Sequence, residues 1–334
     1  MTWRTKINIL TMVGPAVAML VAGSTGAAEL KPWRHGTLDA KSDAGILFMV
    51  GQGFAEKQGL KLEIVQFHND IIEIQALLAG EIDSYESSPG SAMLAASRGA
   101  DVKIVGCNWP VLPHALFVRN EINSVADLKG KTIAVSAPGS LPDIFARAAL
   151  AHFHVPAEEV RFAALGNDPD RYKAVVAGVA QATVVSRQFE PVAEKQGVKL
   201  LVSAQDALPD DVRLCTQMTG KTLSTRGDDA VHFLAADIAA LRYAMTHREE
   251  ALKLTRELTN EKPDDPRAAY IYDWAVKSHA VDPEMTIPAE KLAALKRLLQ
   301  WALGPGQNQV MGLGYVPLPQ SLLEEELKAV AALN

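Results

Sequence analysis

The chain has 334 residues, of which 48% are hydrophobic and 22% are charged, a composition typical of a soluble globular protein and not of a disordered one. Its formal net charge of −6 argues against a generally basic nucleic-acid-binding protein. The two cysteines, Cys107 and Cys215, are too few for a disulfide scaffold or a cysteine-rich zinc site.

The first 28 residues have the three parts of a secretory signal peptide. Arg4 and Lys6 give a positive start, an apolar run follows over 7–22, and the small-residue stretch GSTGAA precedes the expected cleavage before Glu29. The alternative is an N-terminal membrane anchor, but the apolar run is short for a span and contains Gly14-Pro15. The sequence therefore predicts a periplasmic protein that is soluble after cleavage.

Strand and helix patterns alternate through the first part of the remaining chain. Strands are indicated by alternating or continuous apolar residues, and helices by their capping residues and by glycine stops. This alternation predicts a mostly parallel sheet covered by helices. The expected elements are a helix over 43–58, a strand over 60–67, a helix over 70–80, a strand over 82–86, a helix over 89–98 and a strand over 102–107.

A second block of the same kind follows, and then an all-helical tail. The second block has expected strands over 115–119, 131–136, 160–165, 181–186 and 198–202, with helices over 141–153 and 170–178 and a third that ends at Gly197. Two similar blocks in tandem predict two lobes with a cleft between them. Helices are expected over 228–258, 266–279, 288–302 and 320–332, and we expect this tail to pack on the first lobe.

Four phrases in the sequence, in this order, resemble one protein family. FAEKQGLKLEIV is followed by ALLAGEIDSYESSPGSAMLAASRGADVKIV, then by VADLKGKTIAVSAPGS and AVVAGVAQATVVSRQFEPVAEKQG. Together they resemble the periplasmic substrate-binding proteins of ABC importers in the nitrate, sulfonate and taurine group, whose relatives include binders of thiamine-precursor pyrimidines. The resemblance covers roughly residues 33–230 and rests on the order and spacing of the phrases.

This resemblance implies an α/β, two-lobed periplasmic-binding-protein fold (type II), with two parallel-rich sheets and a helical C-terminal extension. Lobe 1 is expected over 29–116 plus 219–334 and lobe 2 over 117–218, with crossings near 114–119 and 214–220. The lobes would close over a ligand as a hinge, and the closed form would dock on an ABC permease in the inner membrane. We expect a monomer with no cofactor, metal or nucleic-acid partner.

Ligands of open α/β sheets bind beyond the carboxyl ends of strands, near helix N-termini. The resemblance places the ligand of this family in the same region, between the lobes. Both arguments select the candidate ligand-binding residues Ser42, Asp43, Phe67, Ser87, Ser88, Trp109, His114, Gly139, Ser140, Asn167 and Arg187.

The turn at 138–141 is the best single candidate segment. Gly139 lets the backbone approach a ligand, and the free N–H groups at the following helix start favour a negative group. The alternative is that the helix start is capped internally, because Ser140 and Asp143 have the spacing of a capping box. The sequence leaves both roles open.

Three other candidates also have two possible roles each. Arg187 either grips a carboxylate or sulfonate through its guanidinium or pairs with Glu190. Trp109 either stacks on a ligand ring or packs at the hinge. His114 either donates a hydrogen bond to the ligand or is a satisfied structural histidine, and we favour the second role.

The charge of the ligand is not settled by these residues. We expect a small organic acid, a carboxylate or sulfonate with aromatic acids included, held by Arg187 and the helix start at Ser140. The alternative is a nitrogen heterocycle or amine, such as a pyrimidine precursor, held by acidic residues with Trp109 stacking on it. Acidic residues near the predicted cleft favour that alternative: Asp43, Glu86, Asp143 and Asp168.

We expect a binding protein and not an enzyme. The sequence contains no G-x-x-x-x-G-K-[ST], H-E-x-x-H or G-x-S-x-G motif. The remaining enzymatic alternative, an activity like that of a pyrimidine synthase of the same fold, needs a cysteine-rich motif, whereas Cys107 and Cys215 are isolated. An oxidising periplasm permits a disulfide between them, but the sequence does not fix this pairing. His152 and His154 do not share a helix face, so we expect solvated side chains there.

Overall fold

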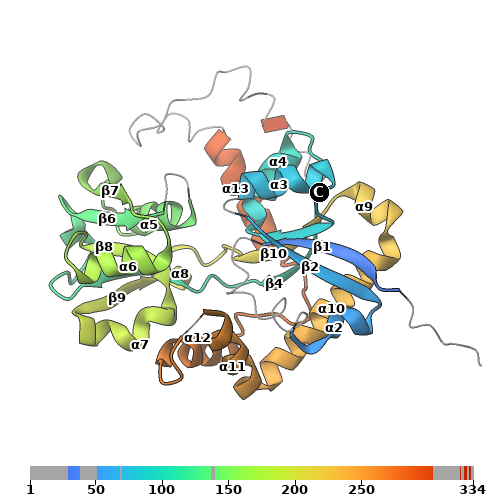
Figure 1. Cartoon of the computed structure of the whole chain (residues 1–334). Coiled ribbons are helices and arrows are strands. Elements are labelled where there is room, and N and C mark those ends of the chain that lie inside the picture. Colours follow the sequence, from blue (N-terminus) through green and yellow to red (C-terminus); the bar gives the residue numbers. More distant parts are fainter. Residues whose placement is uncertain are drawn as a thin grey trace, which may run out of the picture.

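The computed structural model describes residues 29–37, 51–67, 70–136, 140–259 and 261–303, with single residues at 324, 327, 328 and 331. The chain forms two five-stranded sheets within these ranges. Figure 1 shows the sheets in two separate parts of the molecule, each with helices beside it. No helix in the described ranges is long and apolar enough to cross a membrane. The expected signal peptide and the helix expected over 320–332 lie outside the described ranges, apart from the single residues.

The first sheet has the strand order β2-β1-β3-β10-β4. Its strands β1, β2 and β3 pair in parallel, whereas β10 runs antiparallel to both of its neighbours. Helices α2 (Phe54–Lys57) and α10 (Gly227–Thr246) cover one face, where Phe233 stacks on Trp33 with ring centroids 5.3 Å apart. Helices α3 (Asp70–Ala79) and α4 (Pro89–Ser97) cover the other face. The strands are β1 (Lys31–Thr37), β2 (Leu60–Gln66), β3 (Ser84–Ser87), β4 (Lys103–Trp109) and β10 (Leu214–Met218).

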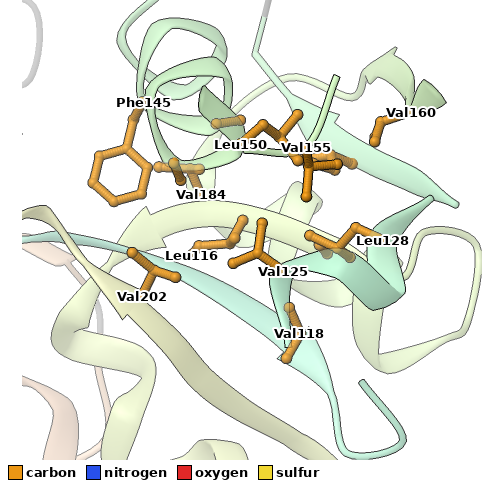
Figure 2. Packing of buried hydrophobic residues seen from close by; sticks show 14 of the residues in the cluster. Leu116, Val118, Val125, Leu128, Phe145, Leu150, Val155, Val160, Val184 and Val202 are labelled. Carbon is orange, nitrogen blue, oxygen red and sulfur yellow. The ribbon is translucent and has the colours of Figure 1, made fainter. Parts of the chain in front are cut away.

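The second sheet has the order β7-β6-β8-β5-β9, with β5 antiparallel to both of its neighbours. Figure 2 shows one side of its core, where Phe145 and Leu150 from α5 pack with Leu116 and Val184 of the sheet. Helices α6 and α7 cover the opposite face. The strands are β5 (His114–Arg119), β6 (Thr132–Val135), β7 (Arg161–Ala164), β8 (Ala182–Ser186) and β9 (Val198–Ser203).

Most helices and strands occur where the sequence pattern predicts them. The helices before β2 and β3 end where Gly59 and Gly80 adopt positive φ angles of 77° and 76°, a conformation that favours glycine. The helices are α2 (Phe54–Lys57), α3 (Asp70–Ala79), α4 (Pro89–Ser97), α5 (Leu141–His152), α6 (Asp168–Val176), α7 (Glu190–Ala193), α8 (Ala204–Ala207), α9 (Gly220–Thr225), α10 (Gly227–Thr246), α11 (Arg248–Thr259), α12 (Pro266–Lys277) and α13 (Ala289–Leu303). Short 3-10 turns are η1 (Val125–Leu128), η2 (Ala157–Glu159), η3 (Arg187–Phe189) and η4 (Glu194–Gln196).

The two-lobed α/β fold is confirmed, and the sheets differ from the expectation in two details. Each is mixed, because the strand next to each crossing, β10 or β5, runs antiparallel to its neighbours. Since β5 pairs over its length within the second sheet, α8 packs on the core of that lobe, and β10 pairs within the first sheet, the chain crosses over 110–113 and again over 209–213. These crossings lie several residues before the predicted ones near 114–119 and 214–220.

The C-terminal tail contacts both lobes, which corrects the expectation that it packs on the first lobe alone. The predicted helix over 228–258 is two helices, α10 and α11, and α10 packs on the first sheet as expected. Helix α12 also contacts η3 and α7 of the second lobe. Figure 1 shows α12 between the two lobes, beside α11.

Candidate functional site

A cavity of about 1920 Å³ lies between the two lobes. It is lined at the carboxyl ends of strands and at the N-terminal ends of α4, α5 and α6, which is where ligands of such sheets bind. Seven of the residues selected from the sequence line it: Phe67, Ser87, Ser88, Trp109, His114, Ser140 and Asn167. Ser42, Asp43 and Gly139 lie outside the described residues.

In the first lobe, β3 brings Glu86, Ser87 and Ser88 to the cavity wall. Glu86 is buried and accepts hydrogen bonds from Thr37 Oγ1 at 3.2 Å and from Asn108 Nδ2 at 3.4 Å. Ser87 is buried as well, and its Oγ has no hydrogen-bond partner among the described residues. This wall therefore offers a carboxylate and a hydroxyl to a ligand.

In the second lobe, Asp168 and Arg171 organise the edge of the site. Arg171, only 1% exposed, donates to the carbonyl oxygens of Gly166 and Val184 and to the carboxylate of Asp168. Asp168 also accepts a hydrogen bond from the backbone N–H of Ser186 at 2.8 Å. The charge of Asp168 is therefore compensated, which weakens the argument from acidic residues against an anionic ligand.

His114 begins β5 directly after the first crossing and pairs with Ser186 of β8. Burial lowers the pKa of His114 to about 4, while nearby Asp168 raises this pKa and Arg213 and Arg171 lower it. The imidazole is therefore neutral near pH 7. Its Nδ1 has no hydrogen-bond partner among the described residues, so the expectation of a satisfied structural histidine does not hold for that atom.

Trp109 ends β4 at the first crossing and packs there, which is one of the two roles that the sequence left open, while its role toward a ligand stays a prediction. Its side chain lines the cavity and also packs with Leu241, Ala275 and Val281 of the tail. The guanidinium of Arg213 lies over its ring at 5.3 Å, and the indole Nε1 is buried without a partner among the described residues. Trp109 therefore borders the cavity, whereas its Nε1–H is covered by protein.

At the start of α5, Ser140 lines the cavity as the N-cap residue. Asp143 accepts a hydrogen bond from Arg147 Nε at 3.0 Å instead of closing a capping box with Ser140. Asp143 is therefore paired with a cation of its own helix, and the side chain of Ser140 makes no cap hydrogen bond, so the alternative of a capping box is not observed.

Arg187 has the alternative partner that the sequence offered. It donates two hydrogen bonds to Glu190 Oε2, at 3.0 Å from Nε and 2.8 Å from Nη2, and its guanidinium lies 5.4 Å from the ring of Trp274 in α12. Its chain neighbours Ser186 and Gln188 line the cavity, whereas Arg187 is not among the described lining residues. The ligand role of Arg187 stays a prediction that this geometry does not favour.

The sequence missed three kinds of lining residue. Arg171 lies in the polar stretch DPDRYKAVV, which has the composition of an exposed helix. Arg213 belongs to the second crossing, which was predicted to begin one residue later. The α12 residues were missed because the tail was expected on the first lobe alone. The spacing of the apolar residues in α12 did indicate that one face of this helix packs against another surface.

A disulfide joins Cys107 of β4 and Cys215 of β10, the pairing that the sequence left open. Both residues are fully buried, beside Val212. The bond links the strand that leads into the first crossing with the strand that follows the second. Separately, no group of three or more His, Cys, Asp or Glu side chains within the described residues is arranged to hold a metal ion.

Sequence comparison relates the chain to a known family. The model of the NMT1/THI5-like family matches residues 42–251. Binding proteins of Brucella abortus (strain 2308) and Brucella suis biovar 1 are each 31% identical over 152 residues, which are 45% of this chain and 47% of those proteins. The chain thus spans about half the length of these curated relatives.

Solved structures share the fold. The periplasmic aliphatic sulphonate binding protein SsuA from Escherichia coli has a TM-score of 0.67 at 22% identity, covering 80% of this chain and 85% of that one. The alkanesulfonate-binding protein SsuA from Xanthomonas axonopodis pv. citri, bound to MOPS, has a TM-score of 0.64 at 18% identity, covering 82% and 93%. At these identities the likeness shows the fold alone.

Proposed function

Because the chain belongs to the NMT1/THI5-like family, we propose that it is the solute-binding component of an ABC importer, exported to the periplasm by its first 28 residues. The open protein captures a small organic molecule in the cavity between the lobes. Contacts from both lobes favour the closed state, which then docks on a membrane permease. The protein acts by binding and release and has no catalytic step.

We propose a small organic acid, a carboxylate or sulfonate, as the ligand. Four polar atoms of lining residues support this class, each covered by protein in this structure and reached by a ligand only when its neighbours move as the lobes close: Ser87 Oγ, Trp109 Nε1, His114 Nδ1 and Arg171 Nε have no hydrogen-bond partner among the described residues. The indole Nε1–H and the guanidinium Nε–H only donate, and a serine hydroxyl also donates. Unpaired buried donors are costly, so a group rich in acceptor oxygens is the complement to this wall.

This set of unpaired donors carries the proposal because it comes from both lobes and from the crossing between them. A ligand oxygen that accepts from Ser87 on one side and from His114 on the other gains its full hydrogen bonding only when the lobes approach. Such a differential contact is what shifts the population toward the closed state. With its proton on Nδ1, the neutral His114 would donate without adding a buried charge, since its pKa is lowered to about 4.

One observation favours a second candidate, a nitrogen heterocycle or an amine such as a pyrimidine precursor. Glu86 is 3% exposed, lines the cavity and accepts from neutral donors in Thr37 and Asn108. A ligand N–H would bind this carboxylate, and Trp109 would contact a ring. Both candidates use the same cavity, so one ligand screen compares them.

The test is a thermal-shift screen followed by titration calorimetry. Acids, sulfonates, amines and pyrimidines are screened, because a ligand that binds only the native state raises the melting temperature. For the acid found, His114→Ala should weaken binding about 10- to 100-fold, the loss expected for one hydrogen bond to a charged group. His152→Ala, an exposed histidine of the same lobe, should leave the affinity unchanged.

Binding of amines or pyrimidines alone, with a dependence on Glu86, would transfer the proposal to the second candidate. Binding of an acid with equal affinity to His114→Ala and wild type would exclude the role given to the imidazole. Circular dichroism of both variants checks that they are folded.

A further inference from the structure

Helix α12 presents one face to the ligand cavity. Ala268, Ile271, Tyr272 and Ala275 all line this cavity, and they form pairs three or four residues apart (268/271, 268/272, 271/275 and 272/275), which places them on the same side of an α-helix. Ala268 and Ala275 are small, and Ile271 is half-buried. The cavity therefore has a third wall, contributed by the tail: this face of α12 is largely apolar, and Asp265 and Arg267 at the start of the helix also line the cavity.

Contacts with both lobes hold this wall in place. On the first-lobe side, Tyr272 donates its hydroxyl hydrogen to the carbonyl oxygen of Ala244 in α10 at 2.7 Å. On the second-lobe side, Arg187 lies over the ring of Trp274 at 5.4 Å, and Arg267 lies over the ring of Phe189 at 5.6 Å. Because Trp274 and Arg267 lie outside the face formed by Ala268, Ile271, Tyr272 and Ala275, and the hydroxyl of Tyr272 is itself bonded to α10, this face keeps a fixed position.

The surroundings of this face extend the apolar wall. Met245 of α10, Val281 after α12 and Leu214 of β10 line the same cavity, next to Trp109. One cavity of about 1920 Å³ is lined both by this apolar surface and by Ser87 and His114, so the apolar and the polar wall border the same space. Half-buried apolar side chains that face such a cavity gain by contact with apolar ligand atoms.

We propose that α12 is the specificity wall of this protein and that its cavity face receives a hydrocarbon part of the ligand. The ligand is then an organic acid with an apolar chain or ring of several carbons, not a compact anion. Ile271 is the central specificity-determining residue. This inference rests on the proposed function, because the acid end is assigned to the polar wall at Ser87 and His114.

The experiment measures dissociation constants for straight-chain sulfonates with two, four, six and eight carbons, by calorimetry on the full mature chain. Burial of each added methylene should tighten binding about two- to fourfold until the chain no longer fits. Ile271→Ser should flatten this dependence on chain length and leave the affinity for the two-carbon acid within about twofold of wild type. Ile271→Val is a milder variant that should flatten it in part.

Val276→Ser is the matched control, because Val276 is an exposed apolar residue of the same helix. It should keep the wild-type dependence on chain length. Equal affinities for all four chain lengths in wild type, or an unchanged dependence in Ile271→Ser and Ile271→Val, would overturn the inference.

The same data separate this inference from the proposed function. If acids bind, bind more weakly to His114→Ala and show no dependence of affinity on chain length, the proposed function stands and the role of α12 as specificity wall is excluded. If no acid of any length binds, both are overturned.

Discussion

Folding stability should fall as the pH drops from 8 to 5, because His35 and His114 are buried in the neutral form. Burial lowers the pKa of His35 to about 3 and is the main cause that lowers the pKa of His114 to about 4. The unfolded chain takes up protons at both residues near the ordinary value of about 6.5, whereas the folded protein does not. Below pH 6.5 the unfolded state therefore binds more protons, and stability falls with falling pH.

The size of the effect follows from these pKa values. Between pH 8 and pH 5, protonation of each histidine stabilises the unfolded chain by about 2 kcal/mol, whereas it stabilises the folded protein by almost nothing. The two residues together should lower the free energy of unfolding by about 4 kcal/mol. Burial raises the pKa of Asp211, which acts in the opposite direction, but this contribution is common to wild type and histidine variants and cancels in their difference.

The assay is urea denaturation at pH 5, 6, 7 and 8. His35→Gln and His114→Gln should each remove about half of the loss between pH 8 and pH 5, since each removes one protonation site. The exposed His152→Gln is the control and should keep the wild-type profile. A wild-type free energy of unfolding that is the same at pH 5 and pH 8, or glutamine variants with the wild-type profile, would refute the reasoning.

Three further outcomes are expected. Replacing Cys107 and Cys215 together by alanine should lower the free energy of unfolding by about 2–5 kcal/mol, because the bond closes a loop over a sequence separation of 108 residues; equal urea midpoints would contradict this. Arg187→Ala should cost about 1 kcal/mol of stability through lost contact with Trp274 and change ligand affinity less than threefold, whereas a 30-fold weaker affinity by calorimetry would restore the ligand role of Arg187. Arg171→Met should cost about 3–5 kcal/mol because it leaves Asp168 and two carbonyl oxygens without their buried donor, and a cost below 1 kcal/mol in urea denaturation would show that Arg171 does not organise this edge.

The sequence was sufficient for the two-lobed fold because its signals are local. Gly59 and Gly80 mark helix ends through a backbone conformation that glycine adopts easily, and the strands between them alternate or are continuously apolar. The rule that ligands bind at the carboxyl ends of strands also located most of the cavity wall. Ser87, Trp109 and His114 were selected in this way and line the cavity.

The remaining features depend on distant partners, which local patterns do not specify. The sequence offered two partners for Arg187, a ligand or Glu190, and the structure shows Glu190. The contact of Arg187 with Trp274 was not predicted, because it depends on the position of α12 beside η3. The apolar spacing of α12 required a partner surface but did not say which lobe supplies it. The crossings were misplaced because β5 and β10 are apolar strands whose sheet membership depends on antiparallel pairing across the chain.

The central claim is that an organic acid binds between the lobes with its acid group at the polar wall. The most direct measurement is a crystal structure of the protein with the tightest-binding acid from the calorimetric series. The account predicts acid oxygens within hydrogen-bond distance of Ser87, Trp109 or His114, and hydrocarbon atoms against Ile271 of α12. An acid bound outside this cavity, or with its acid group turned away from all three polar residues, would contradict the account.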